Sequence, residues 1–479
     1  MKEIKTGNLF IKDFSWYFLG SFLPMLIGFI KTPIFTRHFS KEDYGYLGLI
    51  SITFTFFGMF LFSWIGSCIW RFYNKYKAEN TLKILYSNLF FLYTLAFILL
   101  LGVSMIWYMS VHQILVKKLI LYSFFQLFLN QLFLFYVVVI RLKGQAKLYT
   151  VIQTIKALIS IVIALIMVFY FKANIVALVS SIVIVDAFTL VFLVVYNPVD
   201  IKINVKYVRK INLMELLTYG SIGLILNISL LVISYSDRYI IAWFGNLEDV
   251  GVYDQVYKIA QLSVMALVTV FFNTINPHLL KELETNYAKS NILIQKYIKA
   301  FVIFGLPIIF YLSLFSKDIS TILLGEEFRV GYTIMPYVFF SIYLYGISNF
   351  YELRLKFSNK FKKLGIIALT VAILNIILNI VFIPLYGYKW AAYTTFMTYL
   401  VLTFFLHYLD KEVVLFTKRN SKVLLKIIFF LGLQGLVYRG ITHQFNLNIL
   451  IKLSIGFLYA LIYLVFFKKL LLKTRIPVK

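Results

Sequence analysis

Basic side chains inside long apolar segments are the groups of this chain best placed to do chemistry. Lys31, Arg238 and Lys258 lie within such segments, and Arg37 follows directly after the first one. A charged group at membrane depth is costly, so it normally faces a cavity or a partner of opposite charge. Guanidinium and ammonium groups form charge-assisted hydrogen bonds with phosphate. The four residues are therefore candidates for binding an anionic ligand.

The same charges have a plainer interpretation as neutralised pairs. Asp237 adjoins Arg238, and Asp254 stands four residues before Lys258, which is the order that favours an ion pair on a helix. The sequence alone leaves both interpretations open, ligand binding and local neutralisation.

A second pair of charges lies deeper in the apolar segments. Asp186 is ten residues from Tyr196, and Lys156 is eight residues from Leu148. At 1.5 Å per helical residue they lie about 15 Å and about 12 Å from the same edge of the membrane. We expect the two segments to form a hairpin in which this pair meets. A static ion pair is the favoured interpretation, and a site that couples transport to a proton or cation is the alternative.

The elements that must position these residues are fourteen apolar segments, each long enough to cross a bilayer core of about 30 Å as a helix. They are Phe14–Phe35, Tyr44–Trp70, Ile84–Trp107, Leu119–Ile140, Leu148–Phe171, Ala173–Tyr196, Leu216–Phe244, Val252–Ile275, Ile298–Phe315, Tyr332–Leu353, Leu364–Leu385, Trp390–Leu409, Val423–Tyr438 and Ile449–Phe467. The sequence therefore predicts an all-α integral membrane protein.

The distribution of Lys and Arg predicts the topology of these segments. The two termini and alternate loops carry 33 of the 47 basic residues, the intervening loops carry 9, and 5 lie inside segments. Because cytoplasmic loops are enriched in Lys and Arg, we expect both termini and the basic loops to be cytoplasmic. An even number of spans agrees with this topology.

Composition restricts the class of protein further. The chain is 61% hydrophobic and 14% charged, with a mean hydropathy of +0.86. The net charge of +27 fits cytoplasmic flanks in contact with anionic membrane lipids, and no nucleic-acid partner is expected. The single Cys68 excludes an intramolecular disulfide.

Motifs for enzymatic chemistry are absent from the sequence. There is no P-loop for ATP, and the five histidines are scattered singly, so no metal site and no cofactor are expected. The longest external loop, Ser316–Gly331, is too short for a catalytic domain. We therefore expect a secondary transporter and not an enzyme.

Two short echoes indicate an internal repeat. Phe39–Leu47 resembles Phe244–Tyr253 in an acidic pair and a glycine at the same spacing, and Arg141–Gly144 resembles Arg354–Phe357. The offsets are 206 and 213 residues, and six spans separate each copy from its partner, so the repeats are expected to be parallel. This predicts a six-helix lobe over residues 1–200, a second over 201–410, and two further helices with a basic tail over 411–479.

Two motifs resemble those of a known family. Asp237–Ile241 with Gly251–Tyr253 and Tyr257–Ile259, and Asn375–Asn379 through Ile383–Gly387 to Ala391–Ala392, look like signatures of polysaccharide transporters. These belong to the multidrug/oligosaccharidyl-lipid/polysaccharide (MOP) exporter superfamily. Trp390 stands where that family usually has glycine. Within the superfamily the chain is most similar to O-antigen and capsule flippases (Wzx-like).

The resemblance implies a MATE-like fold and a flippase of the bacterial inner membrane that works by alternating access. Its substrate would be an undecaprenyl-pyrophosphate-linked glycan, with polysaccharide polymerase machinery as a further partner. The implied roles are pyrophosphate contacts for Lys31, Arg37, Arg238 and Lys258, sugar contacts for Tyr253 and Tyr257, and ion coupling for Lys156 and Asp186.

Two other functions remain in competition. A small-molecule exporter of the same fold would carry cationic drugs and should prefer acidic cavity residues. A membrane polysaccharide polymerase or ligase would need a sizeable external loop with catalytic residues, which the sequence does not contain.

Overall fold

The computed structural model describes residues 2–196, 200–285, 287–357, 360–410, 418–445 and 447–468. Every regular element in these ranges is a helix. The chain forms two compact units, Met1–Asp254 and Gln255–Lys479. Most of the predicted basic tail, residues 469–479, and part of the last basic loop, residues 411–417, lie outside the described residues.

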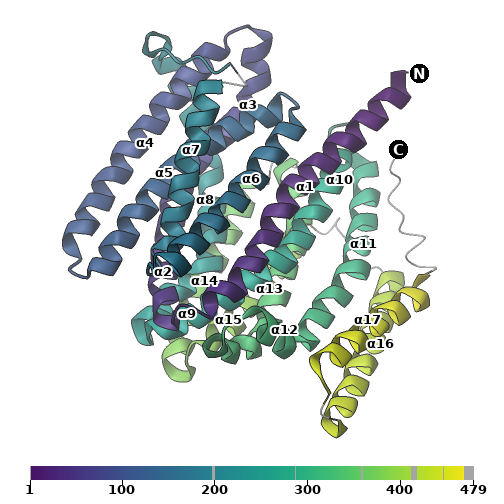
Figure 1. Cartoon of the computed structure of the whole chain (residues 1–479). Coiled ribbons are helices and arrows are strands. Elements are labelled where there is room, and N and C mark those ends of the chain that lie inside the picture. The colour runs from purple at the N-terminus through teal and green to yellow at the C-terminus, as the bar shows by residue number, and fades with distance from the viewer. Residues whose placement is uncertain are drawn as a thin grey trace. The chain divides into compact units, whose positions relative to one another are not determined.

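Long helices dominate the first unit because an apolar segment in lipid must satisfy its own backbone hydrogen bonds. Its helices are α1 (Lys2–Thr36), α2 (Lys41–Gly58), α3 (Trp64–Ala78), α4 (Leu82–Ser110), α5 (Ile114–Leu142), α6 (Ala146–Leu165), α7 (Ala177–Tyr196), α8 (Lys210–Phe244) and the first half of α9 (Leu247–Ala260). Figure 1 shows α4, α5 and α7 running side by side in this unit.

The second unit continues in the same way. Its helices are α10 (Ala266–Thr285), α11 (Tyr287–Leu314), α12 (Ser316–Leu323), α13 (Met335–Phe357), α14 (Phe361–Tyr386), α15 (Lys389–Leu409), α16 (Lys418–Gln444) and α17 (Ile449–Phe466). The last two form a hairpin, drawn in yellow in Figure 1.

The fourteen predicted spans correspond one to one with the candidate membrane spans of the structure. Thirteen described helices are long and apolar enough to cross a membrane, and a fourteenth span results if Glu326–Thr333 and Met335–Lys356, bent by 62°, are counted together. This bent pair corresponds to the predicted span Tyr332–Leu353. The prediction of an all-helical protein with about 14 spans is confirmed.

Three of the spans contain a π-helical turn. Met59–Ser63 joins α2 to α3 within one long span, and Gln261–Met265 joins α9 to α10 within another. These spans are the second and eighth, so the interruption recurs at matching positions of the predicted repeats. Ile166–Tyr170 at the end of α6 is a third such turn.

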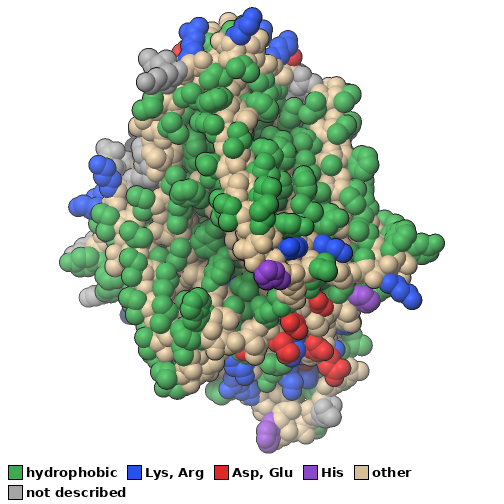
Figure 2. Space-filling view, turned by 90° about the vertical axis from the view of Figure 1, so that its left-hand side faces the viewer, with side chains coloured by type: hydrophobic (Ala, Val, Ile, Leu, Met, Phe, Trp, Pro, Cys, Tyr) green, Lys and Arg blue, Asp and Glu red, His purple; other side chains and the backbone are tan. Residues whose placement is uncertain are grey.

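Apolar side chains cover the outer faces of the helices. On α4, for example, Ile98, Leu99 and Ile106 are 57%, 59% and 72% exposed. Figure 2 shows a face covered mostly by hydrophobic side chains, with Lys and Arg at its top and again lower down, beside a group of acidic side chains. Such a surface is expected for a protein that contacts lipid, and the chain is a multi-pass membrane protein.

Polar contacts anchor the C-terminal hairpin within the second unit. The Tyr311 hydroxyl donates to Gln434 Oε1 at 2.7 Å, and the Tyr463 hydroxyl donates to the Ile303 carbonyl at 2.8 Å. Lys452 Nζ lies 3.2 Å from Asp318 Oδ1 on α12. These bonds fix α16 and α17 against α11 and α12.

Candidate functional site

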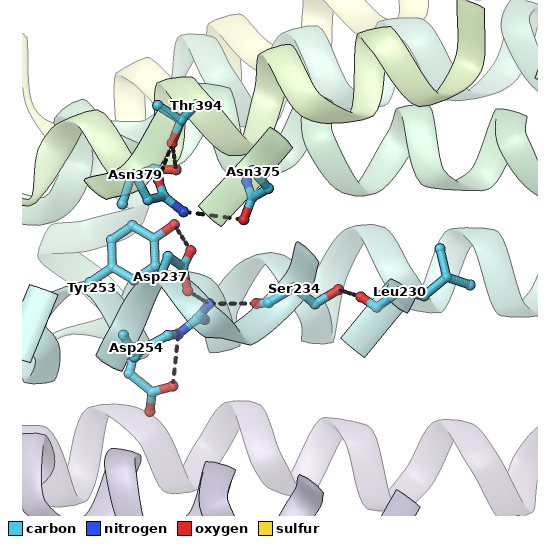
Figure 3. A network of polar contacts seen from close by, with 10 residues as sticks. Leu230, Ser234, Asp237, Tyr253, Asp254, Asn375, Asn379 and Thr394 are labelled. Carbon is cyan, nitrogen blue, oxygen red and sulfur yellow. Dashed lines mark hydrogen bonds and ion pairs between the residues drawn. The ribbon is translucent and has the colours of Figure 1, made fainter. Parts of the chain in front are cut away.

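Four ionisable side chains form a buried cluster at the junction of α8 and α9. Asp237 and Arg238 come from α8, and Tyr253 and Asp254 come from α9, which begins three residues after α8 ends. Arg238 Nη1 donates to Asp237 Oδ1 at 2.7 Å and to the Ser234 carbonyl at 2.6 Å. The Tyr253 hydroxyl donates to Asp237 Oδ2 at 2.6 Å, as Figure 3 shows. We call these four residues the charge cluster.

The charge cluster contains one guanidinium group and two carboxyl groups. Arg238 and Asp237 are 0% exposed, and Asp254 is 4% exposed, with its Oδ1 lying 3.9 Å from Arg238 Nε. The guanidinium carbon also lies over the rings of Tyr235 and Tyr253, at 5.3 and 4.8 Å from their centroids. Because a buried charge is tolerated only when it is paired, these contacts favour neutralisation as the role of Arg238.

The other predicted pyrophosphate contacts are more accessible than Arg238. Lys31 is partly buried in α1, with its Nζ 5.9 Å from the centroid of the Phe35 ring. Arg37 is exposed, and its Nη1 donates to the Pro33 carbonyl at 2.7 Å. Lys258 is partly buried, one turn along α9 from Asp254. Contact of these residues with pyrophosphate stays a prediction.

The two predicted sugar contacts are buried in this structure. Tyr253 is 0% exposed and Tyr257 is 2% exposed. The Tyr253 hydroxyl and ring are both engaged by the charge cluster. A sugar would reach either ring only after the helices rearrange, so this role also stays a prediction.

Lys156 and Asp186 meet in the first unit. Lys156 Nζ on α6 lies 2.7 Å from Asp186 Oδ1 on α7, and the aspartate is 0% exposed. From α5, Asn130 Oδ1 accepts a hydrogen bond from Lys156 Nζ at 3.4 Å, and the Phe133 ring centroid lies 3.9 Å away. Three helices thus surround one ammonium group. The geometry fits a structural ion pair, and a coupling role stays a prediction.

A close crossing of α2 and α9 was not predicted from the sequence. A Cβ atom at Gly45 would collide with the Leu247 carbonyl oxygen, and a Cβ at Gly251 would collide with the Lys41 carbonyl oxygen. Only glycine lets the two backbones approach this closely. Lys41 Nζ also pairs with Glu248 Oε2 at 2.8 Å across the contact. We call this contact the glycine crossing.

The glycine crossing is reciprocal between the two copies of the first sequence echo. Gly251 follows Gly45 by 206 residues, and Leu247 follows Lys41 by the same 206 residues. Gly45 packs on Leu247 and Gly251 packs on Lys41, so the same contact is made twice, once in each direction. The acidic pairs of both copies lie in the first turns of α2 and α9, where they oppose the positive end of the helix dipole. The sequence echo was the signal that could have revealed this contact.

The crossing also touches the charge cluster. A Cβ at Gly48 would lie 3.4 Å from the Asp254 carboxyl group. Asp254 is thus held between α2 and Arg238. A change in the distance between α2 and α9 would directly alter the surroundings of this carboxylate.

The second motif that carried the family resemblance forms a neutral hydrogen-bonded ladder in the second unit. Asn375 Nδ2 donates to Thr398 Oγ1 at 3.1 Å, and Asn379 Nδ2 donates to Asn375 Oδ1 at 3.1 Å. The Thr394 hydroxyl donates to Asn379 Oδ1, and all four side chains are buried. Figure 3 shows three of the ladder residues, Asn375, Asn379 and Thr394. The motif therefore joins two neighbouring helices.

Metal ligation is not suggested by the described part of the chain. No group of three or more His, Cys, Asp or Glu side chains within it is arranged to hold a metal ion. The chemistry available at the charge cluster is ion pairing and hydrogen bonding, and it depends on how closely the helices pack.

Comparisons with known proteins identify the fold. The chain is similar to the lipid II flippase MurJ in an inward closed conformation, with 18% identity and a TM-score of 0.76, covering 95% of this chain and 99% of that one. It is also similar to a multidrug resistance MATE family transporter of the MOP superfamily, in inward-facing and outward-facing conformations. Those two matches have 12% identity and a TM-score of 0.57, and they cover 88% of this chain and 96% and 97% of the transporter.

A sequence comparison identifies the family. No curated protein sequence matches the chain. Residues 10–282 match the family described as polysaccharide biosynthesis protein, which is more than half of the 479 residues. The resemblance drawn from the motifs is thereby confirmed. This chain belongs to the polysaccharide biosynthesis protein family and has the fold of the MOP exporter superfamily.

Proposed function

We propose that this protein is a flippase that moves an undecaprenyl-pyrophosphate-linked oligosaccharide from the cytoplasmic to the outer face of the bacterial inner membrane. The family match and the likeness to the lipid II flippase support a lipid-linked substrate. The repeat unit of O-antigen, capsule or a related polysaccharide is the finer part of the proposal. Polymerase machinery that consumes the exported unit is the expected partner.

The observation that carries this proposal is the extent of the likeness to MurJ. A match that covers 95% of the chain leaves out about 24 residues, which is fewer than the 62 of residues 418–479. It must therefore include at least part of the C-terminal hairpin. The matches to MATE transporters cover 88% and have lower TM-scores. This difference favours the flippase over a small-molecule exporter, and the transporter fold favours both over a polymerase or ligase.

Alternating access between two parallel six-helix lobes is the proposed mechanism, with α16 and α17 peripheral. The reciprocal glycine crossing supports parallel repeats, because its two halves are related by one sequence offset of 206 residues. With the basic loops cytoplasmic, the crossing lies at the outer end of α2 and α9. We propose that it closes the outer side of the substrate path and must separate when the substrate leaves.

Lys31, Arg37 and Lys258 are the proposed contacts for the pyrophosphate group. They are more exposed than Arg238, and ammonium or guanidinium groups pair well with phosphate oxygens. Arg238 is proposed to act indirectly, by holding α8 against α9 through its two aspartates.

The experiment that tests the function is deletion of the gene followed by analysis of lipid-linked sugars and surface glycan. Loss of surface glycan with accumulation of the undecaprenyl-linked precursor, both reversed by the intact protein, is the expected result. A strain that keeps its surface glycan but loses the ability to export cationic dyes would overturn the proposal in favour of a small-molecule exporter.

The proposed topology has its own test. Single cysteines at Asn246 and at Gly144, in a Cys68→Ala background, should be labelled from opposite sides of the membrane, with Asn246 labelled from outside. Labelling of Asn246 only from the cytoplasmic side contradicts the assignment.

Ion coupling at Lys156 and Asp186 can be separated from a structural role. The double variant Lys156→Gln with Asp186→Asn keeps the shape of the pair while removing both charges. If the pair is structural, glycan export by this variant should stay near the normal level at matched expression. Loss of export from a folded protein supports coupling instead.

A further inference from the structure

Arg141, in the last turn of α5, lies within cation–π distance of two aromatic rings from two other helices. Its guanidinium carbon lies 5.1 Å from the ring centroid of Trp70 on α3 and 5.5 Å from that of Tyr149 on α6. Arg141 and Trp70 are exposed, Trp70 by 45%. The guanidinium group is thus fixed by rings and remains accessible to a ligand.

The tyrosine of this arrangement is itself fixed by α1. A Cβ atom at Gly20 would lie 2.8 Å from Tyr149 Cε1, so the two helices are in close contact at this point. The neighbouring Thr150 hydroxyl donates to the Trp16 carbonyl of α1. Because packing restrains the ring, the guanidinium plane that lies over it is restrained as well. A restrained guanidinium loses less conformational entropy when it binds a ligand.

The surroundings of Arg141 in the chain are basic. Lys143 and Lys147 follow within six residues, and the intervening Gly144 has a φ of +73°, which permits a tight turn back into α6. The segment from Arg141 to Lys147 contains no acidic residue. The turn between α5 and α6 therefore carries three basic residues.

The residue related to Arg141 by the second sequence echo is in a different situation. Arg354 is 2% exposed, and its Nε lies 2.7 Å from Asp410 Oδ2, which is also buried. One member of the repeated pair thus forms a buried ion pair, whereas the other is presented at the surface on aromatic rings. Simple repetition of a structural arginine does not explain this difference.

We propose that Arg141, with Trp70 and Tyr149, binds the phosphate of a membrane lipid at the cytoplasmic surface. The side of the membrane rests on the proposed function. Arginine binds phosphate with two parallel N–H groups, and tryptophan and tyrosine concentrate at the level of lipid headgroups. Two lipids carry this chemistry: the lipid-linked substrate, through its pyrophosphate, and an anionic phospholipid of the inner leaflet. With the substrate as ligand, this would be a first docking site before the central path.

The test is a binding measurement on the purified full-length protein with two probes. Farnesyl pyrophosphate represents the pyrophosphate lipid, and phosphatidylglycerol represents the anionic phospholipid. The variant Arg141→Gln should weaken binding of at least one probe by about tenfold, the usual scale for one charge-assisted contact. Weakening for farnesyl pyrophosphate alone assigns the site to the substrate, and weakening for phosphatidylglycerol alone assigns it to a membrane phospholipid.

Two further variants complete the experiment. Lys75→Gln is the control, because it removes a positive charge from α3, the helix that carries Trp70. Lys75 Nζ pairs with Glu215 at 2.7 Å, and its loss should leave the affinities for both probes unchanged. Trp70→Leu keeps the Arg141 charge but removes one ring, and it should weaken binding by about threefold, the scale of an exposed cation–π contact. Equal affinities of Arg141→Gln and the intact protein for both probes would overturn the proposal. Should Arg141→Gln not fold, Arg141→Lys keeps the charge but loses the planar fork, and a smaller loss of affinity is expected.

The result of the binding measurement does not depend on whether the protein transports glycan. Binding of either probe is measured without glycan export, so a chain that fails the deletion test can still pass this one. Conversely, the Arg141→Gln variant could export glycan normally and bind both probes unchanged. That result would overturn the lipid-binding site and leave the proposed flippase function standing.

Discussion

Two buried polar regions carry the motifs typical of the family, and they are built in opposite ways. The charge cluster joins α8 to α9 with one guanidinium and two carboxylates, beside a crossing made by glycines. The ladder joins α14 to α15 with amides and hydroxyls alone, beside Ala391 and Ala392, which are both 0% exposed. Small residues bring the backbones together at the glycine crossing, and small buried residues also lie beside the ladder.

The two regions differ in the energetic cost of separating the helices that they join. A neutral amide that loses its partner in the membrane can find another acceptor, so interhelical bonds of this kind contribute only about 0.6 kcal/mol on average. A buried charge that loses its partner costs about 3–5 kcal/mol. The ladder is therefore suited to permanent packing. The charge cluster makes the α8–α9 junction sensitive to any change in its neighbours, which agrees with the proposed alternating access.

The largest effect is expected for removal of the guanidinium. Arg238→Ala removes the guanidinium that pairs with Asp237 and lies near Asp254 in the buried charge cluster. The variant should lose about 3–5 kcal/mol of stability and all surface glycan. Thermal unfolding of the purified protein and a glycan assay measure both effects. Arg238→Lys keeps the charge but loses the planar fork, so partial recovery is expected. Normal stability of Arg238→Ala would contradict the neutralising role.

Widening the glycine crossing is expected to have the next largest effect. Gly251→Ala places a methyl group against the Lys41 carbonyl and forces α2 and α9 apart. Glycan export should fall by about tenfold or more, because an overpacked contact costs about 1–3 kcal/mol. Gly102→Ala is the matched control, since a Cβ there meets nothing within 4 Å. Equal export by the two variants would show that the crossing is not needed for transport.

Paired neutralisation should be milder than removal of the arginine. Asp237→Asn with Arg238→Gln replaces the ion pair by groups of similar shape that can still hydrogen-bond. Replacing a buried ion pair as a whole is often close to neutral, so the double variant should be more stable than Arg238→Ala and should export glycan at matched expression. A folded double variant without export would restore a direct pyrophosphate role for Arg238.

The sequence predicted the spans well because their length and hydropathy are set by the bilayer itself. It also predicted that Lys156 could meet Asp186, since both depths follow from counting residues along two neighbouring helices. It could not show that Tyr253 bonds Asp237 or that Gly45 packs on Leu247. Those contacts depend on the angles between helices, which hydropathy does not encode. For Asn375, the motif was recognised but its interhelical role was not.

The smallest effect is expected in the ladder. Asn379→Ala removes the amide that donates to Asn375 and accepts from Thr394. Since such bonds in membranes contribute about 0.6 kcal/mol on average and about 1.7 at most, the unfolding temperature should fall slightly and glycan export should persist. Thr398→Val removes the hydroxyl that accepts a hydrogen bond from Asn375 at the other end of the ladder. It should cause the same slight fall in unfolding temperature and leave glycan export in place. Measuring both variants beside Arg238→Ala tests the comparison directly. Abolished export from a stable Asn379→Ala protein would mean that the neutral ladder also takes part in transport and does more than pack two helices.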